Sequence, residues 1–204
     1  MAGAFIFYRL LENNMRKIVV FEMVTLDDYF AGPNGEIDWH NVDAEFEAFV
    51  SVQTKQFGGI VMGHTTYDMM QSFWSSAEAE KESPAVTEAM RNTWKMVFSK
   101  SMQDVTDIPT WKNVKVYRDI RKDEVLGWKQ WDGQDIAIFG SGTIVQQFAN
   151  LGLIDEYRLM LNPIILGAGK SLFKDIAKQK LSLKDMRKFE NGNILLTYAP
   201  QGTK

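Results

Sequence analysis

The chain contains no cysteine among its 204 residues and only two histidines, His40 and His64. The absence of cysteine excludes disulfide bonds, thiol catalysis and cysteine-ligated zinc. The two histidines stand in unrelated sequence contexts, so a histidine metal site is not expected either. We therefore predict no metal site.

Long apolar runs and basic blocks are also missing. No apolar run reaches the roughly 20 residues that a helix needs to cross a bilayer. The apolar segment 4–11 lacks the basic start and the small-residue cleavage site of a secretory signal. The formal net charge is −3 without a basic cluster, which argues against a nucleic-acid partner. We expect a cytoplasmic protein that binds neither membrane nor nucleic acid.

Hydrophobic residues make up 45% of the chain, enough to form the core of one domain, whereas two domains are not expected. Met15 precedes an apolar, strand-like segment and looks like a natural start. We therefore expect residues 1–14 to be an N-terminal extension. Residues 15–200 show no internal repeat and no linker, which predicts a single domain.

One stretch combines a strand, a glycine turn and a helix. The apolar run 136–139 is short enough for a buried strand and leads directly into the glycine turn at 140–142. Thr143 then opens an amphipathic helix, and a second strand follows over 153–166, interrupted by Pro163. The first amides of such a helix have no intrahelical partner, so the turn offers a binding site for phosphate.

Two general nucleotide motifs do not fit this stretch. The third glycine of a G-x-G-x-x-G fingerprint would fall on Val145. The first glycine of a Walker loop ending at Gly169-Lys170-Ser171 would fall on Ile164. Taken alone, Gly140 and Gly142 favour an ordinary tight turn over a binding site.

Two further strands end in similar chemistry. The apolar run 60–62 leads into Gly63 and then into hydroxyl residues that open a helix. The strand 95–98 ends at Ser99. Strands that alternate with helices favour parallel pairing, and ligands of such sheets bind at the carboxyl ends of the strands. Because Gly63, Ser99 and Gly140 each follow such an end, the sequence predicts a dinucleotide site at one sheet edge.

These segments resemble the dihydrofolate reductase-like reductases, in the branch related to the reductase domain of bacterial riboflavin biosynthesis. Segment 135–173 resembles the end of that domain, with its glycine turn, Leu-Ile-Asp-Glu strand entry and Pro-to-Gly-x-Gly-Lys run. Segment 25–32 resembles the family's SLDGxIA motif, and 35–39 resembles GxIDW. Segment 62–67 resembles vMGRxTY.

The chain departs from the family pattern at two positions. Asp28 stands where glycine is usual, and aspartate is a less comfortable choice if the backbone there has a positive φ. His64 stands where arginine is usual, and a neutral histidine offers one donor in place of a charged fork. The preference between NADPH and NADH is therefore open.

The resemblance implies an α/β protein with the three-layer fold of dihydrofolate reductase. We expect a mixed, mostly parallel central sheet with helices on both faces. A C-terminal antiparallel hairpin is expected from strands at 181–189 and 194–199 around an Asn-Gly turn. The family further implies a homodimer, for which we take the edge near 159–166 as the candidate contact.

The activity implied by the resemblance is that of an NADPH-dependent reductase, which passes a hydride to a small heterocycle of pterin or pyrimidine type. The deaminase signatures that accompany the reductase in riboflavin biosynthesis, H-x-E and P-C-x-x-C, are absent from the chain. The alternative is a non-catalytic dinucleotide-binding protein or a dimeric scaffold of the same fold.

The resemblance also assigns roles to individual residues. The segment around Trp39 becomes the loop over the substrate, and Asp27 lies beside the substrate pocket. An alignment with one inserted residue after Trp39 places Glu45 at the substrate-binding acid of dihydrofolate reductases, which could help protonate the bound ring. Glu45 and Asp27 are therefore the candidate catalytic residues. The residues implied for the cofactor are Ala31, Gly63, His64, Thr65, Thr66, Ser99, Lys100, Gly140, Ser141, Gly142, Thr143 and Ile144.

Ordinary structural roles compete with several of these assignments. Glu45 lies in the first turn of a predicted helix over 43–56, where the helix dipole favours carboxylates. Asp27 suits a turn in which its side chain bonds nearby backbone. Trp39 could equally be a partly buried anchor, and Lys100 a solvated lysine at a strand end. The charged segment 75–83 is predicted to be a solvent loop.

Overall fold

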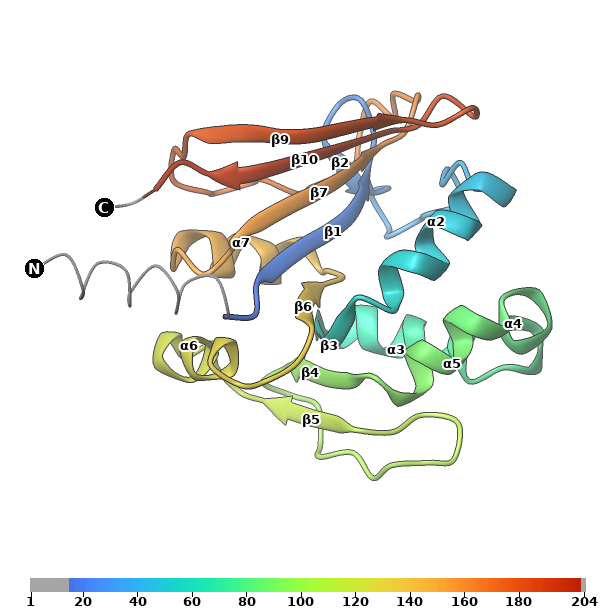
Figure 1. The fold of residues 1–204 in the computed structure, drawn as a ribbon, viewed down its shortest axis with the longest axis vertical. Helices are drawn as coiled ribbons and strands as arrows, with labels where there is room; N and C mark the ends of the chain where they lie inside the picture. Colours follow the sequence, from blue (N-terminus) through green and yellow to red (C-terminus); the bar gives the residue numbers. More distant parts are fainter. Residues whose placement is uncertain (1–14, 203–204) are drawn as a thin grey trace, which may run out of the picture.

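The computed structural model describes residues 15–202, so the expected N-terminal extension lies outside the described residues. A sheet of eight strands in the order β5-β4-β3-β6-β1-β7-β10-β9 runs through the molecule, and β2 pairs with β8 separately (Figure 1). The strands are β1 (Ile18–Val24), β2 (Tyr29–Ala31), β3 (Phe57–Gly63), β4 (Trp94–Phe98), β5 (Val114–Tyr117), β6 (Asp135–Ile138), β7 (Glu156–Leu161), β8 (Lys170–Ser171), β9 (Leu181–Lys188) and β10 (Ile194–Pro200).

The sheet is mostly parallel and ends in a hairpin, as predicted. Neighbouring strands from β5 across to β7 pair in parallel. β10 runs antiparallel to both β7 and β9. Gly192 in the connecting turn has a φ of +91°, a conformation that glycine adopts without steric cost. The Asn-Gly signal in the sequence therefore located the hairpin correctly.

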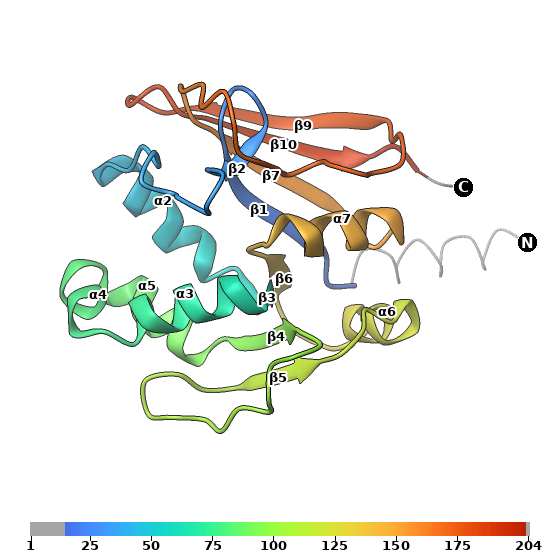
Figure 2. The ribbon, with the colours of Figure 1, turned by 180° about the vertical axis from the view of Figure 1, so that it is seen from behind.

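Helices cover both faces of the sheet, which confirms the three-layer prediction (Figure 1 and Figure 2). α6 and α7 pack on one face, and α2, α3 and α5 pack on the other. No helix within residues 15–202 has the length and apolar character needed to cross a membrane. The helices are α2 (Ala44–Thr54), α3 (His64–Trp74), α4 (Ala77–Glu82), α5 (Pro84–Asn92), α6 (Lys122–Lys129) and α7 (Gly142–Asn150).

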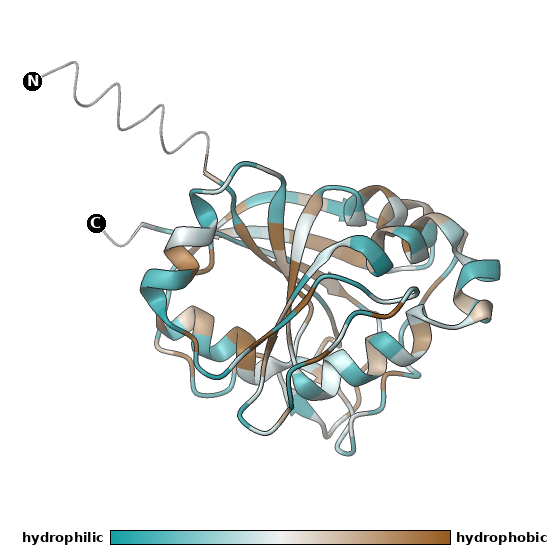
Figure 3. Ribbon diagram, turned by 90° about the horizontal axis from the view of Figure 1, so that it is seen from below, coloured by the Kyte–Doolittle hydropathy of each residue, from teal (hydrophilic) through white to brown (hydrophobic). Residues whose placement is uncertain are grey.

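The central strands are apolar on both sides because both sides are covered. On β3, Val61 faces the core under α6 and α7, while Ile60 and Met62 face the core under α3 and α5. Figure 3 shows hydrophobic colour along the inner strands and polar colour on many loops and outer helix turns. This packing holds the carboxyl ends of the parallel strands in a fixed arrangement at one edge.

The prediction of a solvent loop over 75–83 is wrong. The segment contains the short helix α4, and its buried Ala79 packs inward. The Ser76 side chain caps the helix by accepting a hydrogen bond from the Ala79 amide at 3.1 Å. Alanine favours helix, as do the polar residues glutamate and lysine, and serine favours the N-cap position. Polarity alone was therefore a poor guide here.

The expectation of an exposed sheet edge near 159–166 is also wrong. Its strand part, β7, is an interior strand that pairs with β1 on one side and with β10 on the other. In the described chain the outer strands of the sheet are β5 and β9. Hydrophobic periodicity identifies a strand but not its neighbours, and here the hairpin strand β10 pairs with β7 and covers its outer side.

Candidate active site at the carboxyl edge of the sheet

The three predicted strand ends meet at one edge of the sheet. Gly63 at the end of β3 donates from its amide to the carbonyl oxygen of Gly140 at 3.0 Å. Ser99 follows β4, the neighbour of β3, and its hydroxyl lies 3.5 Å from Nδ1 of His64. The structure thus brings together residues that are more than seventy positions apart, as the parallel-sheet argument predicted.

Two helices begin side by side at this edge. α3 starts at His64 and α7 at Gly142, and neither N-cap residue makes a side-chain capping bond. A Cβ added to Gly63 would lie 3.0 Å from Oγ of Ser141 and 3.4 Å from Cγ1 of Ile144, so the missing side chain lets the helix starts approach. The amides that begin a helix have no partner within it and carry the positive end of the dipole, although in α7 the amide of Ile144 already bonds the Ser141 carbonyl at 2.9 Å.

Hydroxyl and cationic side chains surround these amides. The hydroxyls of Ser141 and Thr143 lie 2.8 Å apart, and Thr65 is exposed in the first turn of α3. Lys100 is exposed beside Ser99. Free amides, hydroxyls and one lysine at two adjacent helix starts are donors suited to phosphate. The residues therefore fit the diphosphate of a dinucleotide.

Gly140 and Gly142, at the start of α7, leave space for the side chains of Glu22 and Phe30. A Cβ at Gly142 would lie 2.5 Å from the ring of Phe30, and one at Gly140 would lie 2.8 Å from Oε1 of Glu22. Gly140 also has a φ of +96°. Phe30 and Glu22 therefore occupy the space beside these glycines. Ala31, next to Phe30 in β2, is buried.

Glu22 is the residue of this edge that the sequence did not indicate. Its Oε1 is buried without a hydrogen-bond partner, although other atoms of the residue remain partly exposed. Burial raises the pKa of the Glu22 carboxyl to about 8. The available signal was a lone carboxylate inside the apolar strand 18–24, a pattern that normally calls for a partner.

Asp27 braces two segments of backbone. Its carboxylate accepts hydrogen bonds from the Thr25 hydroxyl at 2.6 Å, from the Gly167 amide at 2.8 Å and from the Leu166 amide at 3.2 Å. These bonds, led by that from Thr25, hold the pKa of Asp27 below its usual range. The next residue, Asp28, has a φ of +69°, so this position has the positive φ that the family's glycine suggested.

Glu45 is bound elsewhere. Its carboxylate accepts from the Glu190 amide at 2.9 Å and from Nη2 of Arg187 at 2.8 Å, and these bonds lower its pKa. Arg187 belongs to β9, three strands away from β1, which is roughly 14 Å at the usual strand spacing. The structure does not bring Glu45 to the group formed by Gly63, Ser99 and Gly140.

Trp39 lies in a loop that is tied to the same edge. Its indole Nε1 donates to the Glu36 carbonyl at 3.2 Å, and its ring stands edge-on to His40 at 4.6 Å. The amide of Asn41 donates to Oδ1 of the buried Asn162 at 2.9 Å. Because Asn162 directly follows β7, this bond fixes the loop to the carboxyl edge of the sheet.

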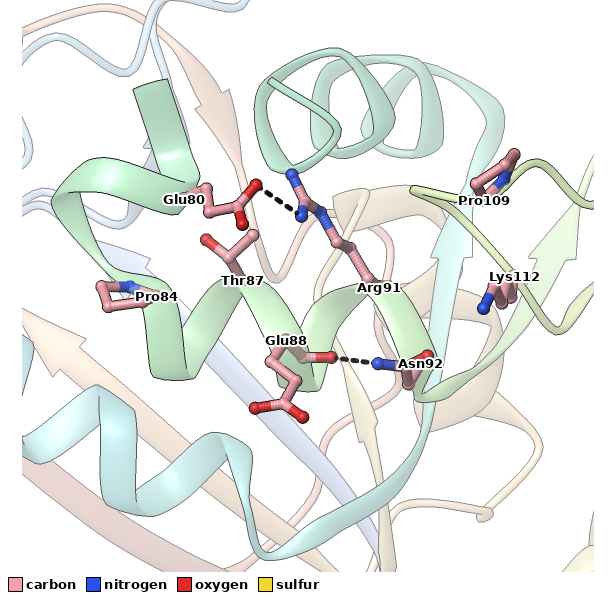
Figure 4. Close-up of a pocket in the computed structure, with 8 residues that line it drawn as sticks. All are labelled: Glu80, Pro84, Thr87, Glu88, Arg91, Asn92, Pro109 and Lys112. Carbon is pink, nitrogen blue, oxygen red and sulfur yellow. Dashed lines mark hydrogen bonds and ion pairs between the residues drawn. The ribbon is translucent and has the colours of Figure 1, made fainter. Parts of the chain in front are cut away.

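A hollow of about 380 Å³ lies elsewhere on the molecule, beside α4, α5 and the segment before β5 (Figure 4). Arg91 is fully engaged there, with bonds to Glu80 at 3.0 Å, to the Trp74 carbonyl and to the Ser76 carbonyl. Asn92 comes just before β4, so the hollow lies toward the amino ends of the strands. Ligands of parallel sheets bind at the opposite ends, and this hollow carries no site.

Comparisons with known proteins agree with this geometry. The model of the RibD C-terminal domain matches residues 16–195. The uncharacterized protein YyaP of Bacillus subtilis is 30% identical over 194 residues, which cover 92% of this chain and 98% of that protein. A protein of Shewanella sp. PV-4, provisionally assigned to riboflavin biosynthesis, is similar in structure with a TM-score of 0.69 and 24% identity, over 91% of this chain and 99% of that one.

A solved structure from Thermotoga maritima, a diaminohydroxyphosphoribosylaminopyrimidine deaminase and 5-amino-6-(5-phosphoribosylamino)uracil reductase, is also similar. Its TM-score is 0.67 at 14% identity, over 95% of this chain and 59% of that one. The structural likenesses establish the fold, and the family model covers most of the described residues. The chain thus belongs to the RibD C-terminal domain family.

Proposed function

We propose that the protein is an NADPH-dependent reductase that transfers a hydride to a small heterocycle of pyrimidine or pterin type. The observation that carries this proposal is that two helices without side-chain caps begin side by side, at His64 and Gly142, on the carboxyl edge of a parallel sheet. Membership of a reductase-like family adds the reaction type, since the Thermotoga maritima relative is named a uracil reductase.

The proposed cofactor residues divide by chemistry. The first amides of α3 and α7, with the hydroxyls of Thr65 and Thr143, hold the diphosphate. Ser99 and Lys100 take the adenosine side, where an ammonium makes a charge-assisted bond to phosphate. His64 reaches both Ser99 and Asp68, the latter at 3.4 Å, so it is placed to contribute to phosphate recognition without the fork of an arginine. When bound, the reduced nicotinamide supplies the hydride.

The substrate is proposed to lie under the loop that carries Trp39. This loop is tied to the end of β7 through Asn41 and Asn162, beside the end of β1. Its neighbours along the edge are the proposed cofactor residues, so a ring bound there would lie next to the nicotinamide. A planar heterocycle suits a site with an aromatic side chain at its margin.

The test is a cofactor titration followed by a turnover assay. NADPH and NADH binding are measured by fluorescence, and NADPH oxidation is then followed by absorbance with three substrates. These are 5-amino-6-(5-phosphoribosylamino)uracil, a dihydropterin and a simple carbonyl compound. We expect NADPH to bind and one of the two heterocycles to be reduced. Binding without any turnover would favour the non-catalytic dinucleotide-binding or scaffold alternative, and absence of binding would remove both.

A further inference from the structure

Glu22 is a carboxyl at the candidate site whose buried Oε1 has no hydrogen-bond partner among residues 15–202. On β1 it lies between Val20 and Val24 on one face of the strand, and both valines belong to the core beneath α6 and α7. The space that a Cβ would take at Gly140 is 2.8 Å from Oε1 of Glu22 and 3.3 Å from Oγ1 of Thr66. The carboxyl therefore lies where the end of β6 meets the first turn of α3.

The surroundings of Glu22 leave it unpaired. On the β7 side its strand partner is the apolar Leu159, and toward α7 it meets the glycine turn at Gly140. Toward α3 its neighbour is the neutral hydroxyl of Thr66. No charged side chain perturbs its titration, since burial is the one cause of its raised pKa. With a pKa of about 8, roughly ten carboxyls in eleven hold their proton at pH 7.

The carboxylates of Asp27 and Glu45 already accept hydrogen bonds from other parts of the protein. Asp27 accepts three hydrogen bonds and Glu45 accepts two, and in both cases the pKa is lowered. An ionised, fully bonded carboxylate can orient a ligand but cannot give up a proton. Glu22 has the opposite properties, because it retains its proton and its Oε1 has no hydrogen-bond partner among residues 15–202.

We propose that Glu22 is the proton donor to the heterocycle, placed beside Gly140 and Thr66 at the junction of β1, β6 and α3. This inference rests on the proposed function. Reduction of a C=N or C=O bond requires a hydride on carbon and a proton on nitrogen or oxygen. When bound, a reduced nicotinamide would supply the hydride to carbon, and Glu22 would give its proton to the heteroatom; the products would be the reduced ring, the oxidised cofactor and a Glu22 carboxylate. Solvent then reprotonates Glu22 through the exposed part of the residue.

The experiment compares Glu22→Gln with the wild-type protein and with Glu47→Gln, a matched change at an exposed glutamate on α2. Glutamine has the same shape and keeps a hydrogen-bond donor but cannot release a proton. We expect turnover to fall about 10²–10⁴-fold in Glu22→Gln, the usual contribution of a positioned acid, with NADPH affinity unchanged. Glu47→Gln should behave as wild type in both measurements.

A second variant and a pH profile separate proton donation from a structural role. Wild-type turnover should fall as the pH rises past about 8, as Glu22 loses its proton. Glu22→Asp keeps an acid at this place, so it should recover part of the turnover and retain the alkaline fall. Glu22→Gln should lose the fall altogether. A structural defect would lower NADPH affinity as well and would leave the shape of the profile unchanged.

Infrared spectroscopy tests the protonation state without any substrate. The carbonyl band of a protonated carboxyl should be present at pH 7 in the wild-type protein, disappear above about pH 8 and be missing in Glu22→Gln. An ionised Glu22 at pH 7, or wild-type turnover in Glu22→Gln, would overturn the inference and leave the reductase proposal standing. Absence of NADPH oxidation by the wild-type protein would overturn both.

Discussion

Two ionisable side chains on strands of the sheet, Lys95 and Glu22, have opposite hydrogen-bonding environments. Lys95 lies near the amino end of β4, where its Nζ donates to the carbonyls of Thr93 at 2.8 Å, Lys112 at 2.9 Å and Arg91 at 3.1 Å. Its ammonium also lies 4.2 Å from the centre of the Trp111 ring. Near the carboxyl end of β1, Oε1 of Glu22 has no partner.

The contrast separates Lys95, which stabilises the fold, from Glu22, which is free to bond a ligand. A buried polar group without a partner costs free energy, so proteins satisfy nearly all of them. Lys95 follows that rule by donating to three backbone carbonyls in two segments. Glu22 breaks the rule at the edge where parallel sheets bind their ligands. A bound ring that accepts a hydrogen bond from Glu22 would supply the missing partner.

The largest effect on stability is expected from Lys95→Met. The change removes the Lys95 donor from the carbonyls of Thr93 and Lys112, whereas the Arg91 carbonyl keeps the Lys112 amide at 3.1 Å. Each unsatisfied acceptor costs about 1–3 kcal/mol. We expect the free energy of unfolding to fall by about 3 kcal/mol or more, measured by urea denaturation. Lys112→Met, at an exposed lysine, is the control and should change it little. Equal stability of the two variants would show that the hydrogen bonds of Lys95 do not stabilise the fold, which would contradict the contrast with Glu22.

The pH dependence of stability tests the other side of the contrast. The folded pKa of Glu22 is raised from 4.5 to about 8, so the folded state binds the extra proton and stability falls as the pH rises through this interval. At 1.36 kcal/mol per unit the fall is bounded by about 5 kcal/mol, and partial exposure reduces our expectation to about 2 kcal/mol. Denaturation between pH 5 and 9 should show this fall in wild type and its absence in Glu22→Gln.

Thr143→Asp should weaken NADPH binding about tenfold. The new carboxylate would stand in the first turn of α7, close to the proposed diphosphate, where like charges repel. The helix itself should not suffer, because its dipole favours a carboxylate at this end. Fluorescence titration gives the affinity, and Thr143→Asn controls for shape. Unchanged affinity in Thr143→Asp would count against the placement of the diphosphate.

The smallest effect is expected from Glu45→Gln. Because the Glu45 carboxylate is held by Arg187 and by the Glu190 amide, away from the strand ends, turnover should change by less than about threefold. The comparison with Glu22→Gln in the same assay ranks the two acids directly. A loss of about 100-fold in Glu45→Gln would restore the role that the dihydrofolate reductase alignment assigned to it.

The sequence predicted the main frame of the site. Gly63, Ser99 and Gly140 were located because a buried strand followed by glycine or serine is a local pattern, and parallel pairing brings such ends to one edge. The comparison of Asp28 with the family's glycine raised a positive φ as a condition, and the structure shows it at +69°. Each of these inferences needed only neighbouring residues and a general rule for parallel sheets.

Glu22 and Lys95 could not be interpreted in this way. In the sequence each is a charged residue in an apolar strand, and nothing nearby distinguishes them. The difference depends on partners that lie elsewhere in the chain, such as the Lys112 carbonyl for Lys95 and the Gly140 turn for Glu22. The same holds for Glu45, whose partner Arg187 is 142 positions away.

The sequence by itself determined the main strands and helices apart from α4, β2 and β8, the closing hairpin and the helix starts that offer free amides, because hydrophobic period, glycine and capping residues act over short distances. Only the tertiary structure decided which buried charges are satisfied. Hydrogen bonding and desolvation depend on atoms brought together from distant segments, so the burial of Glu22 and its raised pKa became visible only once β1, β6 and α3 were assembled.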